Sequence, residues 1–320
     1  MDPKVSIVIV TWNGEADLRL CLESLKGLDY DNYDITVVDN ASKDGTCQML
    51  RSEFSYVRLI ALDKNAGRSE GLNIGTAQTD GKYVLHLDND VKMTDPRFLR
   101  TLVEAMEQDE AIGACGPTVL DKDSDRIQAT GGTIDFKRVT SSYHSWVGQT
   151  DYKSLTDPIE CDYIVGCAAL FRRSAMDRVG HYDSRYVVYW DDSDICIMMK
   201  EMGMKVVSIP SATISHKVGG SGGARSAFAY FHCAKNRIIF MRKHGKLADW
   251  PGFLVSLALQ PWPGDSKRRR LKYWRTIYPS MLKAIWWNIR DAVISRGRTQ
   301  VHEECSCGCG PGAGQGSQTR

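Results

Sequence analysis

The stretch that decides the fold is Tyr83-Val84-Leu85-His86-Leu87-Asp88-Asn89-Asp90, in which apolar residues run directly into two carboxylates. A run rich in β-branched and large apolar residues, followed by polar residues, predicts a buried strand. Ligands bind at the carboxyl edge of the sheet in open α/β folds, so Asp88 and Asp90 would lie at a binding edge. Neighbouring carboxylates repel each other unless a cation shares them, and Mg²⁺ or Mn²⁺ suits oxygen ligands. The stretch therefore predicts a metal–diphosphate site, although Asp-x-Asp is also common in polar turns.

Three earlier segments repeat this pattern of a buried strand followed by polar residues and a helix. Segments 5–10, 35–38 and 57–60 are rich in β-branched residues, which is typical of strands covered on both faces. Strands that alternate with helices in this way predict a mainly parallel sheet built from βαβ units. The polar residues after these strands are Thr11, Asn13, Asp39, Asn65 and Arg68. Together with the acidic pair they would gather at one sheet edge, which favours a pocket over chance loop residues.

Two common phosphate-binding loops are missing from the sequence. No Gly-x-Gly-x-x-Gly follows the first predicted strand, and no Gly-x-x-x-x-Gly-Lys-Ser/Thr occurs in the chain. These loops bind phosphate with backbone N–H groups in dinucleotide-binding and P-loop proteins. Phosphate would instead have to be bound by a metal ion and side chains.

A second acidic cluster, Trp190-Asp191-Asp192-Ser193-Asp194, precedes a helical pattern. Acidic residues at a helix start are favoured by the helix dipole, which is the structural explanation. The functional explanation is a general base, which must lie within hydrogen-bond reach of the attacking oxygen. Because Asp191 and Asp192 together exceed what one cap requires, the functional explanation is favoured.

Two later features have both a functional and a structural explanation. His216 could offer a neutral ring nitrogen to a metal, although a lone histidine is more often a hydrogen-bonding residue. Gly219-Gly220-Ser221-Gly222-Gly223 predicts a flexible loop, which could act as a lid over substrate or serve only as a linker.

The composition is that of an ordinary globular protein of 320 residues, with 42% hydrophobic and 25% charged residues. The cysteines of the body show no metal-ligand spacing, so reduced thiols in a cytoplasmic protein are expected. Residues 1–4 lead directly into the first strand without an apolar signal region. No stretch reaches the roughly 18–20 consecutive apolar residues of a spanning helix.

The charge is concentrated near the carboxyl end of the chain. Residues 262–298 carry ten Lys and Arg against Asp265 and Asp291, whereas the whole chain has a net charge of only +2. Tryptophans and aliphatic residues in this segment form an amphipathic pattern, broken or restarted at Pro279. Such helices can lie on an anionic membrane, which predicts a peripheral location on the inner face of the plasma membrane. Packing onto the body and a homo-oligomer contact are the alternatives.

Read in order, the motifs resemble those of family-2 inverting glycosyltransferases with the GT-A nucleotide-binding fold. The resemblance covers roughly residues 4–244 and is closest to bacterial rhamnosyl- and galactofuranosyltransferases of cell-surface polysaccharide assembly. The motifs are Val5–Gly14, Val37–Gly45, Asn65-x-Gly67, Asn73-x-Gly75, Asp88-Asn89-Asp90, Gly166-x-Ala168, Trp190–Asp194, His216 and Lys235-Asn236-Arg237. It implies a glycosyltransferase domain at 1–244. Beyond it, composition and pattern predict a basic amphipathic helical extension at 245–300 and a disordered Cys/Gly-rich tail at 301–320.

The resemblance also implies roles for the residues at matching positions. Thr11, Asn13, Glu15, Asp39, Asn65, Arg68, Asp88 and Asn89 would contact the nucleotide or the donor sugar. Asp90 and His216 would bind a divalent cation, Mg²⁺ or Mn²⁺. Asp192 would be the catalytic base with Asp191 beside it, where the family often has Glu-Asp, and Gly166 and Trp190 would lie near the acceptor.

The function predicted from the sequence is transfer of a sugar from a UDP- or dTDP-sugar to a hydroxyl of a glycan or polyprenyl-linked acceptor. A base would deprotonate the hydroxyl, and a single displacement at the anomeric carbon would invert its configuration. A non-catalytic nucleotide-sugar-binding protein of the membrane surface is the alternative, and a nucleotidyltransferase is a third candidate. No nucleic-acid partner is expected.

Overall fold

The computed structural model describes residues 2–122, 124–143, 148, 150, 154, 157–217, 226–259 and 267–306. The strands are β1 (Val5–Thr11), β2 (Tyr33–Asp39), β3 (Arg58–Ala61), β4 (Tyr83–Asp88), β5 (Val91–Met93), β6 (Ile112–Asp121), β7 (Ile127–Ala129), β8 (Gly132–Asp135), β9 (Thr140–Tyr143), β10 (Ile159–Glu160), β11 (Ala168–Arg172) and β12 (Lys205–His216). The helices are α1 (Glu15–Leu25), α2 (Thr46–Glu53), α3 (Arg68–Ala77), α4 (Phe98–Gln108), α5 (Arg173–Val179), α6 (Asp191–Glu201), α7 (Ala227–His244), α8 (Trp250–Leu259) and α9 (Lys267–Ser306).

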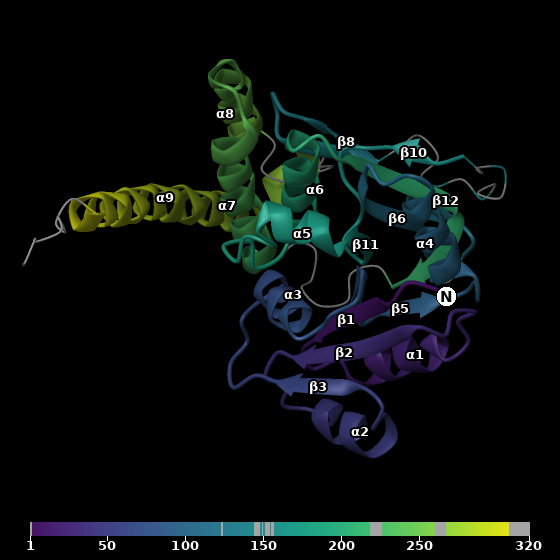
Figure 1. The fold of residues 1–320 in the computed structure, drawn as a ribbon. Helices are drawn as coiled ribbons and strands as arrows, with labels where there is room; N and C mark the ends of the chain where they lie inside the picture. Colours follow the sequence, from purple (N-terminus) through teal and green to yellow (C-terminus); the bar gives the residue numbers. More distant parts are fainter. Residues whose placement is uncertain are drawn as a thin grey trace, which may run out of the picture.

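Most of the strands form one twisted sheet, in the order β10-β12-β6-β11-β4-β1-β2-β3 (Figure 1). Strand β1 pairs in parallel with both β2 and β4, which confirms the predicted βαβ arrangement. Strand β11 lies antiparallel between β4 and β6, a direction that the sequence pattern did not indicate. The parallel register places Thr11 beside Asp39 and Val10 beside Asp88. The polar strand ends therefore meet at one edge of the sheet, as predicted.

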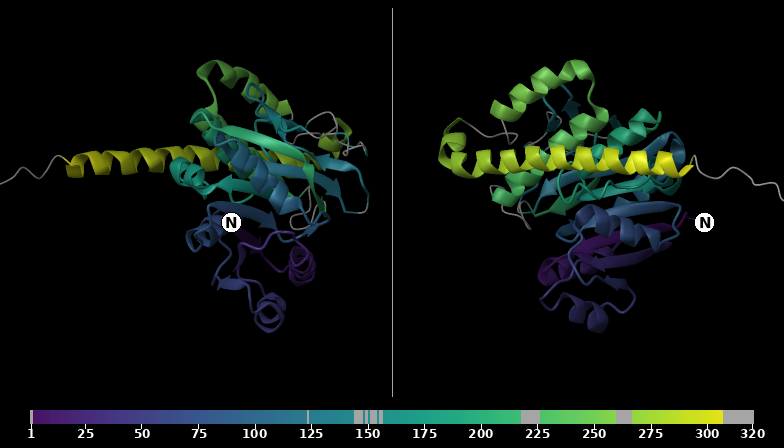
Figure 2. Two further views of the ribbon diagram at one scale, coloured as in Figure 1. Left: turned by 45° about the vertical axis from the view of Figure 1, so that its right-hand side comes forward. Right: turned by 90° about the vertical axis from the view of Figure 1, so that its left-hand side faces the viewer.

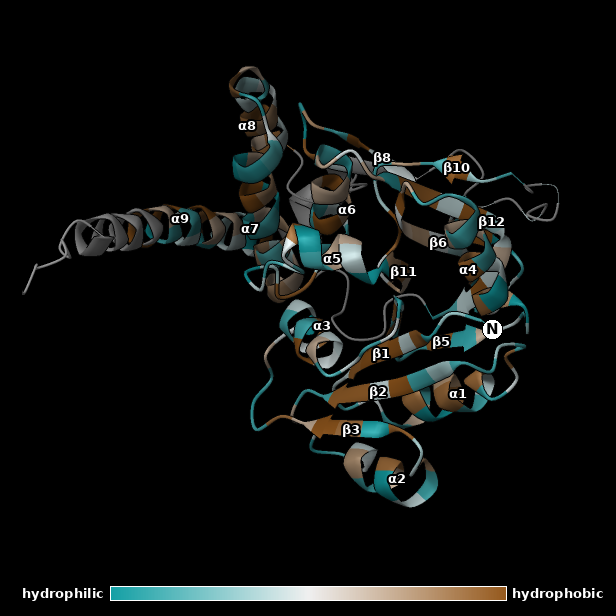
Figure 3. Cartoon of the chain, in the orientation of Figure 1, coloured by the Kyte–Doolittle hydropathy of each residue, from teal (hydrophilic) through white to brown (hydrophobic). Residues whose placement is uncertain are grey.

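Helices cover both faces of the sheet. In β1, Ile7 and Ile9 belong to one core cluster and Val8 belongs to the other, because successive side chains of a strand point to opposite faces. Helices α1, α2 and α4 pack in the first cluster, while α3, α5, α6 and α7 pack in the second. The colouring by hydropathy in Figure 3 shows the apolar strands between these helices. The edge of the sheet that bears the polar strand ends is therefore supported by packed side chains on both faces.

The carboxyl-terminal helices pack on the body through α7. Ile277 and Ala284 of α9 are fully buried, and Phe253 of α8 joins the second core cluster. Packing, one of the alternatives for this segment, is therefore observed, and Figure 2 shows α9 crossing the body and continuing beyond it. The helix runs through Pro279 instead of restarting there. Proline removes one N–H donor from the helix, while the nearby Ile277 and Ser280 are buried against the body.

Three sequence predictions concern segments at the margins of this fold. Within the residues that the structure describes, no helix has both the length and the apolar content required to cross a membrane. The predicted glycine-rich lid at 219–223 lies outside the described residues. Of the tail predicted at 301–320, residues 301–306 belong to α9 and residues 307–320 lie outside the described part of the chain. The lid and the disorder of the tail stay predictions.

Candidate active site

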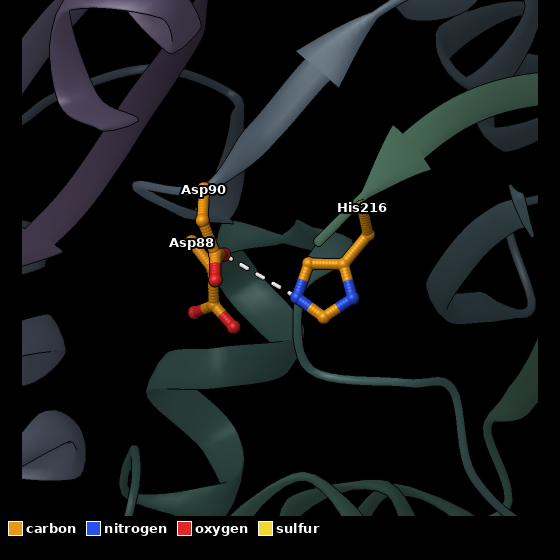
Figure 4. A group of neighbouring side chains, drawn as sticks. All are labelled: Asp88, Asp90 and His216. Atoms are coloured by element: carbon orange, nitrogen blue, oxygen red, sulfur yellow. Dashed lines mark ion pairs between the residues drawn. The ribbon is translucent and has the colours of Figure 1, made fainter. Parts of the chain in front are cut away.

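Two aspartates and a histidine meet at the edge of the sheet (Figure 4). Asp88 ends β4, Asp90 follows it, and His216 ends β12, where it pairs with Val91 of β5. This antiparallel pairing brings His216 beside Asp90, and their Nε2 and Oδ1 atoms lie 3.3 Å apart. One ligand atom from each of the three residues lies within 4.8 Å of the others. Two carboxylates and an imidazole at this separation suit a divalent cation.

His216 is oriented by Gln128 of β7. The Gln128 Oε1 atom lies 2.8 Å from Nδ1 of His216, and an amide oxygen can only accept a hydrogen bond. Nδ1 therefore carries the proton, which leaves Nε2 facing Asp90 as a potential metal ligand. Burial lowers the pKa of His216, but the hydrogen bond and charge of Asp90 outweigh it and raise the pKa above its usual value. Gln128 was not predicted, because its segment shows no periodic pattern in the sequence.

Arg68 connects the acidic pair of β4 with the acidic cluster of α6. Its Nε donates to Asp88 Oδ1 at 3.0 Å, and its Nη1 donates to Asp191 Oδ2 at 2.6 Å. Its Nη2 donates to the carbonyl oxygen of Gly166 at 2.5 Å. Burial opposes the charged form, yet the charges of Asp88 and Asp191 raise the pKa of Arg68 further above its usual value. The guanidinium thus sets the spacing of both acidic groups.

Asp191 and Asp192 have different environments at the start of α6. Asp191 is buried; its Oδ2 accepts a hydrogen bond from Arg68 and lies 3.3 Å from the Ser69 hydroxyl oxygen. Asp192 accepts from the backbone N–H of Gly166 at 3.1 Å and from that of Ser193 at 2.7 Å. Burial and the neighbouring charge of Asp191 raise the pKa of Asp192 to about 6. Asp192 therefore changes its protonation at a pH closer to neutrality than an ordinary aspartate does.

The third aspartate of this cluster has a structural environment. Asp194 is buried and accepts hydrogen bonds from the Tyr186 hydroxyl at 3.0 Å and the Lys243 ammonium at 2.6 Å. The His244 Nε2 atom lies 2.8 Å from Oδ1 of Asp194, the same oxygen that accepts from Tyr186. These contacts attach α6 to the end of α7 and so hold the helix that carries Asp192.

The predicted nucleotide-binding residues line the ends of β1, β2 and β4. Asp39 is buried, and its Oδ2 accepts from the backbone N–H of Ser42 at 3.0 Å. Its Oδ1 is also buried but has no hydrogen-bond partner among the described residues. A buried acceptor without a partner is destabilising, so this atom is suited to a ligand N–H group.

Side chains from neighbouring loops fix the shape of this region. Asn13 accepts from the backbone of Lys43 at 2.7 Å, and the amide of Asn89 donates to the Thr11 hydroxyl at 2.9 Å. A Cβ atom at Gly14 would lie only 2.2 Å from the Asn89 amide nitrogen, so a larger residue there would displace the Asn89 side chain. A cavity of about 620 Å³ beside them is lined by Asn13, Gly14, Glu15, Ala16, Asp17, Arg19, Leu20 and Asp44.

The loop that carries Asn65 is held by a residue whose role was not predicted. Asn65 accepts from the backbone N–H of Gly67 at 2.9 Å. The buried side chain of Asn40 accepts from Ala66 N–H at 2.9 Å and donates to Gly67 O at 3.0 Å. The sequence indicated only that Asn40 follows a buried strand. Its contact with a residue 26 positions away follows only from the fold.

The two residues predicted near the acceptor lie in different surroundings. Gly166 lies between Arg68 and Asp192, and a Cβ atom there would approach the Arg68 Nη2 to 3.1 Å. Trp190 is buried, and its ring centroid lies 5.1 Å from that of Phe240 on α7. The structure thus brings Gly166 into the site, whereas the indole of Trp190 packs in the core beneath it.

Comparison with known proteins agrees with this geometry. The family model described as glycosyl transferase family 2 matches residues 6–180. The N-acetylglucosaminyl-diphospho-decaprenol L-rhamnosyltransferase of Mycobacterium tuberculosis is 26% identical, over 75% of this chain and 85% of its own length. The dTDP-rhamnosyl transferase RfbF of Shigella flexneri is 24% identical, over 68% of this chain and 71% of its own length.

Solved structures share the fold at low sequence identity. The mannosyltransferase of Pyrobaculum calidifontis in complex with GDP-Man and Mn²⁺ superposes with a TM-score of 0.58 and 18% identity, covering 91% of this chain and 88% of that one. The S. aureus TarS 1–349 complex with UDP-GlcNAc gives a TM-score of 0.58 and 14% identity, covering 88% and 80%. These likenesses show a shared fold, the GT-A fold with a mainly parallel central sheet, so the predicted fold class is confirmed.

Proposed function

The chain belongs to glycosyl transferase family 2, and on this basis we propose that Asp192 is the base of an inverting transfer from a nucleoside-diphosphate sugar to a hydroxyl group. The observation that carries the proposal is the contrast within the acidic pair. Arg68 occupies the Oδ2 atom of Asp191, whereas the pKa of Asp192 is raised to about 6. A carboxylate with such a pKa can accept a proton near neutral pH. Asp192 would accept the hydroxyl proton while the hydroxyl oxygen attacks the anomeric carbon opposite the leaving diphosphate.

Asp90, His216 and one oxygen of Asp88 would bind a divalent cation, Mg²⁺ or Mn²⁺. The support is the donor set itself, together with Gln128, whose Oε1 lies 2.8 Å from Nδ1 of His216 so that Nε2 faces Asp90. When bound, the cation would neutralise the negative charge that develops on the departing diphosphate. Arg68 would remain hydrogen-bonded to Asp88 and so orient this carboxylate.

The donor would be a UDP- or dTDP-sugar. The buried Oδ1 of Asp39 could accept a hydrogen bond from the ring N–H of uracil or thymine. The named relatives use rhamnosyl donors and, in one case, a diphospho-decaprenol acceptor, which supports a glycan or polyprenyl-linked acceptor here.

A panel of UDP- and dTDP-sugars with Mg²⁺ or Mn²⁺ tests this function. We expect release of the nucleoside diphosphate, and faster release when a lipid-linked acceptor is added. Release of pyrophosphate would indicate a nucleotidyltransferase instead. Binding of the donors without turnover would favour a non-catalytic nucleotide-sugar-binding protein.

The rate should fall on the acidic side of neutrality. Because the pKa of Asp192 is raised to about 6, the carboxylate is available above that pH and becomes protonated below it. A protonated base cannot accept the hydroxyl proton, so kcat/KM should fall about tenfold for each pH unit below this value. Rates measured with saturating Mn²⁺ give the profile, and UDP binding at each pH is the control. A flat profile between about pH 5 and 8 would contradict the role of Asp192.

The outer face of α9 would contact an anionic membrane surface, at the inner face of the plasma membrane. Leu282, Trp286, Ile289 and Val293 follow helical spacing and are 60% to 65% exposed. The helix carries ten Lys and Arg against Asp291, Glu303 and Glu304. A second copy of such a basic helix would be repelled, whereas each basic residue near an anionic lipid surface contributes about 1 kcal/mol. The charge therefore favours lipid over a homo-oligomer contact.

Replacing Leu282 and Trp286 together with glutamine should remove membrane binding. The change deletes the centre of the apolar stripe but keeps the basic residues, so the expected loss of binding to phosphatidylserine vesicles is at least about tenfold. Sedimentation with vesicles measures it. The exposed Tyr56 lies on the loop before β3, and Tyr56→Gln serves as the control. Unchanged sedimentation of the double variant, or a concentration-dependent dimer that it abolishes, would overturn the membrane assignment.

A further inference from the structure

The loop that leads into Asp191 and Asp192 is held at every backbone carbonyl from residue 185 to residue 189. From the α7 side, Lys235 Nζ donates to Arg185 O at 2.6 Å. From the α3 side, the Ser69 hydroxyl donates to Tyr186 O, and Arg68 N–H donates to Val187 O at 2.9 Å. The loop is therefore fixed between two helices, one of which also carries the guanidinium that contacts Asp88.

Asn236 supplies the last two of these hydrogen bonds. Its amide nitrogen donates to Val188 O and to Tyr189 O, each at 2.7 Å. The side chain is fully buried, and no described residue donates to its Oδ1. The two N–H groups of Asn236 therefore determine how its side chain is oriented, since both donate to the loop.

The backbone that Asn236 holds is strained. Tyr189 and Trp190 have φ values of +67° and +68°, in the left-handed region that large side chains rarely adopt. Trp190 is also the residue at which the chain turns into α6. Two consecutive residues in this conformation persist only where surrounding contacts enforce it, and such strain is concentrated at functional sites. Asp191 follows directly, so the direction of α6 and of its first carboxylates depends on this turn.

We propose that Asn236 is a positioning residue that keeps Asp192 in place by enforcing the left-handed turn at Tyr189 and Trp190. The proposal rests on the role of Asp192 as the base. Without the amide, the carbonyls of Val188 and Tyr189 lose their donor and the turn can relax toward an ordinary conformation. Asp192 would then move relative to the acceptor hydroxyl, while the nucleotide side of the site, built on β1, β2 and β4, would keep its shape.

Asn288 of α9 provides a matched control. It is also a buried asparagine whose amide nitrogen donates to two backbone carbonyls, those of Lys235 at 3.1 Å and Ala284 at 3.0 Å. These carbonyls belong to helices and not to the loop. Loss of Asn288 should therefore resemble loss of Asn236 in stability but not in its effect on Asp192.

The experiment compares Asn236→Ala and Asn236→Ser with Asn288→Ala in the full chain. We expect Asn236→Ala to lower kcat about 10- to 100-fold, because small misplacements of a catalytic group have effects of this size. The serine variant retains one donor and should lie between alanine and the native protein. The donor KM and the binding of UDP or dTDP with Mn²⁺ should stay within about twofold in all variants. Asn288→Ala should lower the unfolding temperature and leave kcat unchanged.

Hydrogen exchange of the backbone amides of residues 191–195 gives a readout that needs no turnover. It should accelerate in Asn236→Ala and not in Asn288→Ala. If no donor is turned over by the native protein, the proposed function fails, but the exchange rates still decide whether Asn236 fixes this turn. Unchanged exchange and unchanged kcat in Asn236→Ala would overturn the inference. Equal losses of kcat in Asn236→Ala and Asn288→Ala would also overturn it, because they would show a merely structural role.

Discussion

Replacing Asp192 with asparagine lowers kcat about 10²- to 10⁴-fold, because the variant loses the group that accepts the hydroxyl proton. The asparagine side chain has nearly the same size as that of Asp192, and its Oδ1 can still accept the hydrogen bond from the Ser193 N–H. Nucleotide affinity should therefore change less than about twofold, since binding and proton transfer are separable in the kinetics. Single-turnover rates and titration with UDP or dTDP in the presence of Mn²⁺ measure the two quantities.

A matched substitution tests whether the effect belongs to this carboxylate. Asp177 lies on α5, and the Oδ1 of its exposed side chain lies 3.3 Å from Nε2 of His181. Asp177→Asn removes one carboxylate as well, and it should leave turnover unchanged. Full transfer activity in Asp192→Asn would rule out Asp192 as the base.

Replacing Asp90 with asparagine removes metal-dependent turnover. The change deletes a negative ligand beside His216, and a cation at such a site contributes several kcal/mol to stabilising the departing diphosphate. Each 1.4 kcal/mol of lost stabilisation lowers the rate about tenfold, so we expect turnover to fall by more than about 100-fold. Electron paramagnetic resonance of free Mn²⁺ measures the loss of binding directly, without relying on turnover.

A graded variant distinguishes loss of a ligand from general damage. Gln128→Leu removes the acceptor that orients His216 and leaves the ligands in place, so Mn²⁺ affinity should fall about 10- to 100-fold. Excess Mn²⁺ should restore its turnover but not that of Asp90→Asn. Asp125→Asn changes an exposed carboxylate of the same segment and is the control. Native Mn²⁺ affinity in Asp90→Asn would place the cation elsewhere.

Much of the fold could be predicted from local patterns in the sequence. The alternation of buried strands and helices predicts parallel pairing of β1, β2, β3 and β4, because β-branched runs covered on both faces are typical of such sheets. The polar residues after each strand then predict the site edge. The order of the motifs predicts the family. Each of these predictions uses residues close together in sequence, where periodicity of 2.0 or 3.6 residues determines which side chains share a face.

The roles within the acidic clusters could not be predicted in this way. In the sequence, Asp191, Asp192 and Asp194 are three similar carboxylates before a helix. Packing separates them: Arg68, 123 positions away, binds Asp191, and Lys243 binds Asp194. Asp192 is left with two backbone N–H donors and a raised pKa.

The stretch Tyr83–Asp90 shows the same difference between what local sequence and what tertiary structure determines. Tyr83–Asp90 by itself determined a buried strand that ends in two carboxylates at a sheet edge. Only the tertiary structure decided that β5 pairs with β12 and brings His216 to Asp90, and that Arg68 takes one oxygen of Asp88. Local sequence encodes the period of a strand, whereas the partner of each carboxylate depends on which distant strand or helix packs beside it.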